Sequence, residues 1–363
     1  MKKVLMGATA LAMVGGASFA GGIDRSGQGV NILFEEGNYL QFTFSRVNPS
    51  VTGTNPIPAV GNSNDVAKSY NTFGFGYKHE INEKLDMALI YDQPFGAHIH
   101  YTDGPLSAGG AAGLPYDGLA EINSDALTAL LQYDLGNGFS IHGGARALKV
   151  RGTIQSGNGI LRASSDYDFG GVVGVAYEKP EIALRVALTY ATEINNAFEG
   201  VNAAFPAGSQ DRVFDVDFPE SVNLDFQTGV AANTLVFGSV RWVGWGGFSL
   251  DTTPEGSWVD FSDDTINYTL GVGQRINDKL SVALQVGYEK AGNRPSTTAL
   301  APTTGSKSVG LGATYQVNEK LSVSGGLTYA IPGDQSYNLS PGVDIAFEDN
   351  EAIGAGFRIG YRF

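Results

Sequence analysis

The chain has 363 residues, a formal net charge of −14, 50 glycines, 20 phenylalanines, 16 tyrosines and no cysteine. The negative balance, without a basic stripe, argues against a nucleic-acid partner. Because there is no cysteine, disulfides cannot stabilise the fold. A sequence rich in glycine and aromatic residues but with only 4 methionines favours strands and tight turns over helices. We therefore expect an all-β protein.

The first twenty residues have the pattern of an export signal. Two lysines precede an apolar stretch, and Ser18-Phe19-Ala20 forms a small-x-small cleavage site. This pattern predicts a secretory signal peptide over residues 1–20. The apolar stretch is too short and glycine-interrupted for a membrane helix, and no later segment offers the roughly eighteen continuous apolar residues that a spanning helix needs. We expect the mature chain to leave the cytoplasm without a helical anchor.

The segments that follow alternate between apolar and polar residues and are joined by two kinds of connection. Six are short polar turns, at 79–85, 133–139, 177–183, 231–235, 274–281 and 315–322. Seven are longer and rich in glycine, proline and acids, at 48–67, 97–124, 152–165, 192–217, 250–263, 291–306 and 332–350. The thirteen connections alternate strictly and join fourteen strands. This regularity predicts an antiparallel transmembrane β-barrel over 39–363 in a bacterial outer membrane, with both termini periplasmic.

The last strand, GAGFRIGYRF, shows which face should meet lipid. Its apolar side carries Phe357, Ile359, Tyr361 and Phe363, and only glycine and arginine occupy the other side. In a membrane barrel the apolar face contacts outer-membrane lipid and the other face lines the lumen. A C-terminal aromatic in this pattern resembles the signal that the outer-membrane assembly machinery reads. We therefore expect Phe363 to serve insertion.

Residues 21–38 precede the first strand, which is expected to start near Tyr39. This segment is either a disordered tail or a small plug that folds inward. Its apolar centre includes Ile32, Leu33 and Phe34, and apolar residues gain by leaving water. The composition favours the plug.

The third strand ends irregularly, in YDQPFGAHIHY at 91–101. Pro94 cannot donate to a β-ladder, and Gly96 marks a bulge or bend. At membrane depth these residues would open a gap in the wall. Alternatively, the strand has already left the membrane and the loop begins here. Spacing leaves both interpretations open.

The connection that follows, at 102–123, is unusually apolar. Leu106, Leu114, Tyr116 and Leu119 could form an exposed patch, and such patches often mark binding sites. A flexible glycine-rich loop without a ligand is the alternative.

Four stretches together resemble one family. They are YDQPFG at 91–96, DFPESVNLDF at 217–226, VRWVGWGGF at 240–248 and the terminal GAGFRIGYRF. In this order they are similar to the FadL/TodX-type outer-membrane transporters of long-chain fatty acids and other hydrophobic compounds. The resemblance implies an N-terminal hatch, an outer groove, an inner ligand pocket and lateral release, with Pro94, Phe95 and Gly96 forming the opening. The chain departs from the family in lacking an Asn-Pro-Ala motif within 21–38 and in its short loops.

A carboxylate cargo would need a cation in the lumen. Alternation within the strands suggests five inward-facing candidates: Arg146, Lys149, Arg151, Arg185 and Arg275. Each could instead pair with lumen acids such as Asp86 and Asp92. An uncharged cargo would need no cation.

A general diffusion porin for small polar solutes is the main alternative function, because many inward positions are glycine, alanine or serine. No nucleophile motif accompanies His98 and His100, so we expect no enzyme, catalytic residue, cofactor or metal. Asp211, Asp215 and Asp217 are more readily explained as a solvated acidic loop than as a calcium site. We predict a monomeric channel for hydrophobic small molecules.

Overall fold

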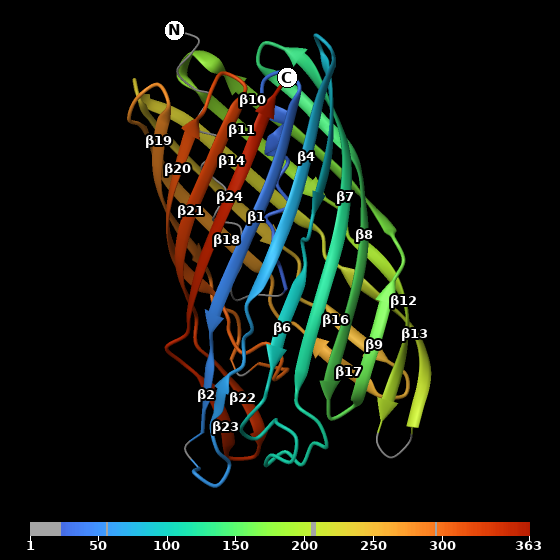
Figure 1. Cartoon of the computed structure of the whole chain (residues 1–363). Helices are drawn as coiled ribbons and strands as arrows, with labels where there is room; N and C mark the ends of the chain where they lie inside the picture. The colour runs from blue at the N-terminus through green and yellow to red at the C-terminus, as the bar shows by residue number, and fades with distance from the viewer. Residues whose placement is uncertain (1–22, 56, 205–207, 295) are drawn as a thin grey trace.

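The computed structural model describes residues 23–55, 57–204, 208–294 and 296–363. The segment predicted to be a signal peptide, 1–20, lies outside these ranges. Figure 1 shows a tall barrel of tilted strands that encloses a lumen. Within the described ranges, no helix is long and apolar enough to cross a membrane.

The barrel wall is one closed antiparallel sheet. Its segments are β1 (Tyr39–Ser50), β4 (Tyr70–Asn82), β5 (Leu85–Asp92), β6 (Gly96–His100), β7 (Leu119–Gly136), β8 (Phe139–Ser156), β9 (Gly159–Ser165), β10 (Asp168–Lys179), β11 (Leu184–Ala191), β12 (Ile194–Ala204), β13 (Gly208–Phe218), β14 (Ser221–Ala231), β15 (Thr234–Val243), β18 (Thr265–Arg275), β19 (Leu280–Glu289), β20 (Ser306–Gln316), β21 (Leu321–Pro332) and β24 (Glu351–Arg362). The segment pairs β5/β6, β9/β10, β11/β12 and β13/β14 each form one interrupted strand. The described wall therefore has fourteen strands, as predicted. It closes where β1 pairs with β24 on one side and with β4 on the other.

The two faces of the wall have the inverted polarity of a membrane barrel. On β24, Phe357, Ile359 and Tyr361 are exposed on the outside, whereas Arg358 lines an internal cavity. Leu270, Leu311 and Leu327 are likewise more than half exposed, at 53%, 63% and 63%. In water such a surface would be unfavourable, but against lipid it is the stable arrangement. The orientation predicted for the last strand is confirmed.

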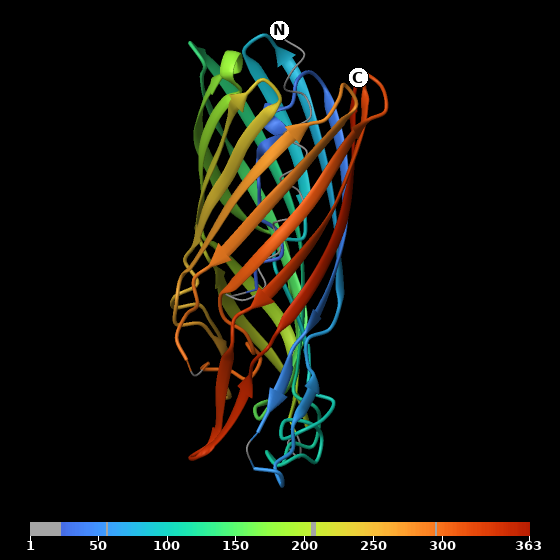
Figure 2. The same ribbon diagram turned by 90° about the vertical axis from the view of Figure 1, so that its left-hand side faces the viewer.

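The two ends of the barrel differ in their connections. The six predicted short turns lie at one end, where Tyr39 at the start of β1 pairs with Arg362 at the end of β24. At the other end, a four-stranded sheet extends beyond the wall (Figures 1 and 2). It consists, in order, of β22 (Gln335–Ser340), β23 (Val343–Phe347), β2 (Thr52–Thr54) and β3 (Ser63–Asp65). A hairpin of β16 (Ser249–Thr252) and β17 (Gly256–Asp260) lies at the same end.

Two of the predicted long loops are wrong. Much of 152–165 belongs to β8 and β9, and most of 192–217 belongs to β12 and β13. In these extensions the inward residues are apolar, such as Leu161 and Phe198, whereas Arg162 and Glu199 face outward and are exposed. These stretches carry glycine, polar residues and, at 192–217, acids, because the outer face of these strands suits water rather than lipid. A composition rich in glycine and polar or acidic residues therefore misidentified these strands as loops.

Candidate functional site

The third strand breaks away from its neighbour at the residues singled out in the sequence. The ladder between β4 and β5 runs from the Asn82–Leu85 pair to the Phe75–Tyr91 pair. Pairing with the third strand is next recorded at the isolated Ala67–Ile99 bridge. We call the stretch between these two pairs the wall break. Because β6 continues to pair with β7 as far as His100, the kink lies within the strand and does not begin the loop.

The backbone groups of the kink are satisfied from inside the barrel. The amide of Arg25 donates to the Pro94 carbonyl at 2.6 Å, and the amide of Gly96 donates to the Ile23 carbonyl at 2.8 Å. These bonds place Asp24 opposite Phe95 in an antiparallel bridge. The hydroxyl of Ser124 completes the set, since it lies 2.8 Å from both the amide and the carbonyl oxygen of Phe95. The N-terminal chain thus supplies the bonds that β4 does not.

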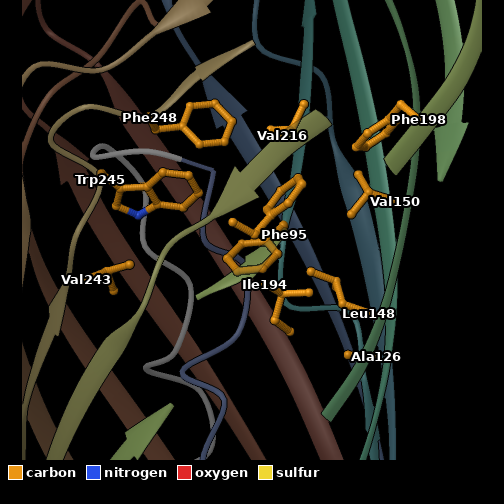
Figure 3. Close-up of a cluster of buried hydrophobic side chains, with 11 residues drawn as sticks. Phe95, Ala126, Leu148, Val150, Ile194, Phe198, Val216, Val243, Trp245 and Phe248 are labelled. Atoms are coloured by element: carbon orange, nitrogen blue, oxygen red, sulfur yellow. The ribbon is translucent and has the colours of Figure 1, made fainter. Parts of the chain in front are cut away.

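The side chain of Phe95 points into the lumen and enters an aromatic cluster (Figure 3). Its ring centre lies 5.1 Å from that of Phe218 and 5.7 Å from that of Trp245, which it meets edge to face. Trp245 in turn packs against Phe248 at 5.1 Å. These partners come from the DFPESVNLDF and VRWVGWGGF stretches. The motifs that were separate in the sequence therefore meet at the kink.

Beside this cluster lies a cavity of about 60 Å³ with an almost wholly apolar lining, which we call the apolar pocket. Phe198 and Phe214 stack on one side at 5.3 Å with nearly parallel rings. The remaining wall comes from the inward faces of β6, β7, β8, β9 and β13 and from the β16–β17 hairpin, including Ala97, Ile122, Val150, Ile154, Leu161, Val216, Leu250 and Val259. Since β6 begins at the kink and supplies Ala97, the pocket adjoins the kink.

Lys149 and Arg151 face outward, contrary to expectation. Leu148 and Val150 occupy the inward positions of β8 and belong to the buried cluster around Phe95. Arg151 forms an ion pair with Asp125, whose other oxygen accepts the hydroxyl of Tyr91 at 2.6 Å. The Nζ atom of Lys149 lies 3.8 Å from the exposed carboxylate of Asp166. The lumen is apolar at this level, so the cations lie on the other face.

The other three head-group candidates lie apart from the apolar pocket. Arg146 is buried inside the barrel and donates to Thr128 at 3.0 Å and to Gln28. The guanidinium of Arg185 lies 4.7 Å from the ring centre of Phe34. Arg275 is at the short-turn end and pairs with Asp278. Arg146 and Arg185 therefore contact the N-terminal chain, and Arg185 also lines the polar cavity described below.

Residues 23–38, which we call the N-terminal segment, run inside the barrel from the kink to the short-turn end (Figure 2). A short 3-10 helix, η2 (Asn31–Phe34), buries Ile32 and Leu33 in a cluster with inward-facing residues of the wall. Phe34 is partly buried against the same cluster. Nearer the kink, the hydroxyl of Ser26 donates to Asp92 at 2.5 Å. Apolar contacts at one end and polar bonds at the other hold the segment in the lumen.

The anchors of the N-terminal segment were not identified from the sequence. Arg241 pairs with Asp24 at 3.2 Å, and Asn223 donates to the Gly27 carbonyl at 2.8 Å. Both residues belong to the stretches that carried the family resemblance, and both face inward by simple alternation with Val222 and Trp242. That alternation could have marked them. Arg25 carries no comparable signal, because its contacts depend on where the segment lies.

A second, polar cavity of about 350 Å³ occupies the other side of the lumen. Besides the N-terminal segment, its lining includes polar residues of β1, β15, β18, β19 and β21, such as Gln41, Thr43, Ser239, Thr269, Gln285 and Ser324. Its polarity contrasts with that of the apolar pocket. The lumen therefore contains an apolar part, lined mainly by β6 to β9, β12 and β13, and a polar part, lined mainly by β1, β4, β14, β15 and β18 to β21.

The apolar patch expected in the loop at 102–123 is not exposed. Leu106 is buried with Tyr101 and Phe347 beneath the four-stranded sheet, and Leu114 packs against that cluster. The hydroxyl of Tyr116 donates to the Ser156 carbonyl at 2.8 Å, and Leu119 begins β7. The apolar residues of this loop serve the packing of the outer sheet. They do not gather into one open groove.

Comparison with known proteins agrees with this architecture. Residues 6–363 match the family described as outer membrane protein transport protein (OMPP1/FadL/TodX). The chain belongs to this family. No curated protein sequence matches it. As a member of the OMPP1/FadL/TodX family, it is a transport protein of the bacterial outer membrane.

Solved structures of similar fold include members of the same family. A Pseudomonas aeruginosa FadL homologue superposes with a TM-score of 0.75 at 13% identity, covering 99% of this chain and 98% of that one. The P. putida toluene transporter TodX gives 0.64 at 11% identity, with 92% of each chain covered. The Ralstonia pickettii toluene transporter TbuX gives 0.62 at 12% identity, with 99% of each covered. At these identities the likeness shows the shared fold.

Proposed function

We propose that this family member takes up small, uncharged hydrophobic molecules and releases them sideways into the membrane through the wall break. The observation that carries the proposal is the apolar pocket, which adjoins the kink at Phe95. A hydrophobic molecule held there would gain by passing directly into lipid, because the alternative exit leads into water. Pro94, Phe95 and Gly96 would form the opening.

The lining of the pocket favours an uncharged cargo over a fatty acid. Arg151 is the one charged residue among the described residues that line it, and its guanidinium is paired with Asp125 on the outer face. A carboxylate placed in the pocket would therefore be desolvated without a cationic partner, which is strongly unfavourable. The stacked rings of Phe198 and Phe214 offer flat apolar surfaces instead. We take aromatic hydrocarbons as the preferred class, a choice consistent with the toluene transporters of similar fold.

Cargo entry would require the pocket to widen. A benzene molecule occupies an engineered protein cavity of about 150 Å³, which exceeds the present 60 Å³. The N-terminal segment lines the pocket through Ile23 and bonds the kink through Arg25. We propose that this segment is a plug, and that its displacement both enlarges the pocket and frees the kink. We further propose that both chain ends lie on the periplasmic side. Phe363 would serve insertion by the assembly machinery, and the channel would be a monomer.

Passage of small polar solutes is the second candidate function, and the polar cavity of about 350 Å³ favours it. The two functions make opposite predictions in reconstituted vesicles. Vesicles containing the protein should accumulate labelled toluene much faster than protein-free vesicles and should not swell in isotonic arabinose. Rapid swelling in the sugar, with toluene entry at the protein-free rate, would overturn the proposal in favour of a diffusion porin.

A further inference from the structure

The side chain of Arg25 occupies the wall break. A Cβ atom added to Gly96 would lie 2.4 Å from Cζ of Arg25 and 2.5 Å from its Nε and Nη1 atoms. On the other side, Cζ of Arg25 lies 4.1 Å from the ring centre of Tyr70. Gly96 begins β6 and Tyr70 begins β4, the two strands that the break separates. The guanidinium therefore bridges the two sides where backbone pairing is interrupted.

Because residue 96 is glycine, space for the Arg25 guanidinium remains on the face of β6 directed away from the apolar pocket. The next residue, Ala97, lines the pocket, and side chains alternate along a strand, so a side chain at 96 would point outward. The neighbouring outward position on β7 is Glu121, which lies opposite His98 in the β6–β7 ladder. The negative charge of Glu121 attracts the Arg25 cation. Arg25 thus reaches from the N-terminal segment into the gap between the two strands. Only glycine at 96 leaves room for it.

We infer that Arg25 closes the wall break at rest, and that cargo leaving sideways must displace its guanidinium. This inference rests on the lateral release proposed above. The backbone amide of Arg25 bonds Pro94, and its neighbour Asp24 pairs with Arg241, so withdrawal of the N-terminal segment would remove the closing side chain as well. The segment would in this way couple opening of the lumen to opening of the wall.

A cation stacked on an aromatic ring suits such a closure. The contact is favourable where the cation is shielded from water, and it needs no partner in the β-ladder. Breaking it leaves the pairing of β4 with β1 and of β6 with β7 intact. The closure can therefore open and shut without loss of the barrel.

The absence of cysteine from the chain allows a direct test. Thr72 lies on the inward face of β4 beside the break, where its hydroxyl is 2.6 Å from that of Ser45. The variant Thr72→Cys would be placed in vesicles containing a maleimide attached to a phospholipid acyl chain. This reagent stays in the bilayer, so it reaches position 72 through the break. Labelling is followed in the full-length protein without cargo.

We expect Arg25→Gly to raise the labelling rate about tenfold or more, since the closing side chain is gone and lipid-phase groups gain a path. The matched control, Arg162→Gly, removes an outward-facing arginine of β9 and should leave the rate unchanged. Gly96→Ala supplies a second variant that keeps Arg25 but displaces it, and it should also accelerate labelling. Heat-modified mobility on gels verifies that each barrel is folded.

Labelling of Cys at position 72 at an unchanged rate in both folded variants, Arg25→Gly and Gly96→Ala, would overturn the closure. Faster labelling with an unchanged rate of toluene uptake would leave the closure standing and would instead contradict lateral release. The two proposals thus fail separately.

Discussion

The carboxylate of Asp24 lies 3.2 and 3.3 Å from Nη2 of Arg241, and both side chains are buried. Nη1 of Arg241 donates to Asn223 at 2.8 Å, and Asn223 donates to the Gly27 carbonyl at 2.8 Å. Two strands of the wall thus hold two points of the N-terminal segment. Because the pair is buried, loss of one partner leaves an uncompensated charge.

We predict that Arg241→Met releases the N-terminal segment. Stranding the Asp24 charge in the lumen costs about 3–5 kcal/mol, a large fraction of what a segment of this length can gain by docking. Ion conductance in planar bilayers should rise. Arg275→Met is the control, since the Asp278 partner of Arg275 is exposed and no buried charge is stranded.

The double variant Asp24→Asn/Arg241→Met should conduct less than Arg241→Met alone, because the stranded charge is removed. Wild-type conductance in the single variant would show that the ion pair does not hold the segment.

A second prediction concerns the apolar pocket. Val216 is buried and lines it, so Val216→Trp should fill the space that cargo needs. Overpacking of this kind costs about 1–3 kcal/mol of stability, which a barrel of this size tolerates, while toluene affinity should fall about tenfold or more. Equilibrium dialysis measures the affinity. Leu327→Trp, on the lipid-facing side, is the matched control. Unchanged binding in Val216→Trp would mean that cargo binds elsewhere.

A third prediction concerns pH and the hairpin of β16 and β17. Hydrogen bonds from Arg212, then from Thr252, lower the pKa of Glu255 from 4.5 to about 2. Since the pKa is lower when the hairpin is docked, the stabilisation is complete above pH 4.5 and is lost as the pH falls towards 2. Trp258 reports this, because its indole donates to the Thr252 hydroxyl at 2.7 Å.

Trp258 emission should therefore change between these two pH values, and Arg212→Gln should move the change to higher pH. Trp258→Phe gives the background from the other tryptophans. An identical acid transition in wild type and Arg212→Gln would contradict the role of this ion pair.

The barrel could be predicted from the sequence because lipid imposes a simple rule on the strands. On β24, apolar residues alternate with glycine and arginine from Ile353 to Arg362, and the structure follows that pattern. The rule failed at 152–165, where the surroundings of the outer face change from lipid to water. It also failed for Lys149 and Arg151, which were assigned to the lumen by alternation although Leu148 and Val150 hold the inward positions. The pairing of β7 with β8 is continuous there.

The candidate site was predictable only in part. Pro94 and Gly96 break the rules of a β-strand and so could be recognised without coordinates. The residues that contact the wall break from inside could not be predicted. Ile23 and Arg25 are brought to it by a segment whose path depends on burial inside the barrel. Leu106 shows the converse error, because an apolar loop residue was taken as exposed although it packs beneath the outer sheet.

Uptake by the proposed route requires the N-terminal segment to separate from the kinked third strand. Asp24 and Phe95 form a non-hydrogen-bonded antiparallel pair, flanked by the two backbone bonds at the kink. In such pairs the Cα atoms lie about 4.5 Å apart, within the range that a disulfide spans. The variant Asp24→Cys/Phe95→Cys should therefore form a single crosslink in a chain that has no other cysteine.

The decisive measurement is toluene uptake by this one variant in its oxidised and reduced forms, so that the effects of the substitutions themselves cancel. We expect oxidation to abolish the protein-dependent uptake and a reductant to restore it. Equal uptake by both forms would show that the N-terminal segment need not separate from the third strand.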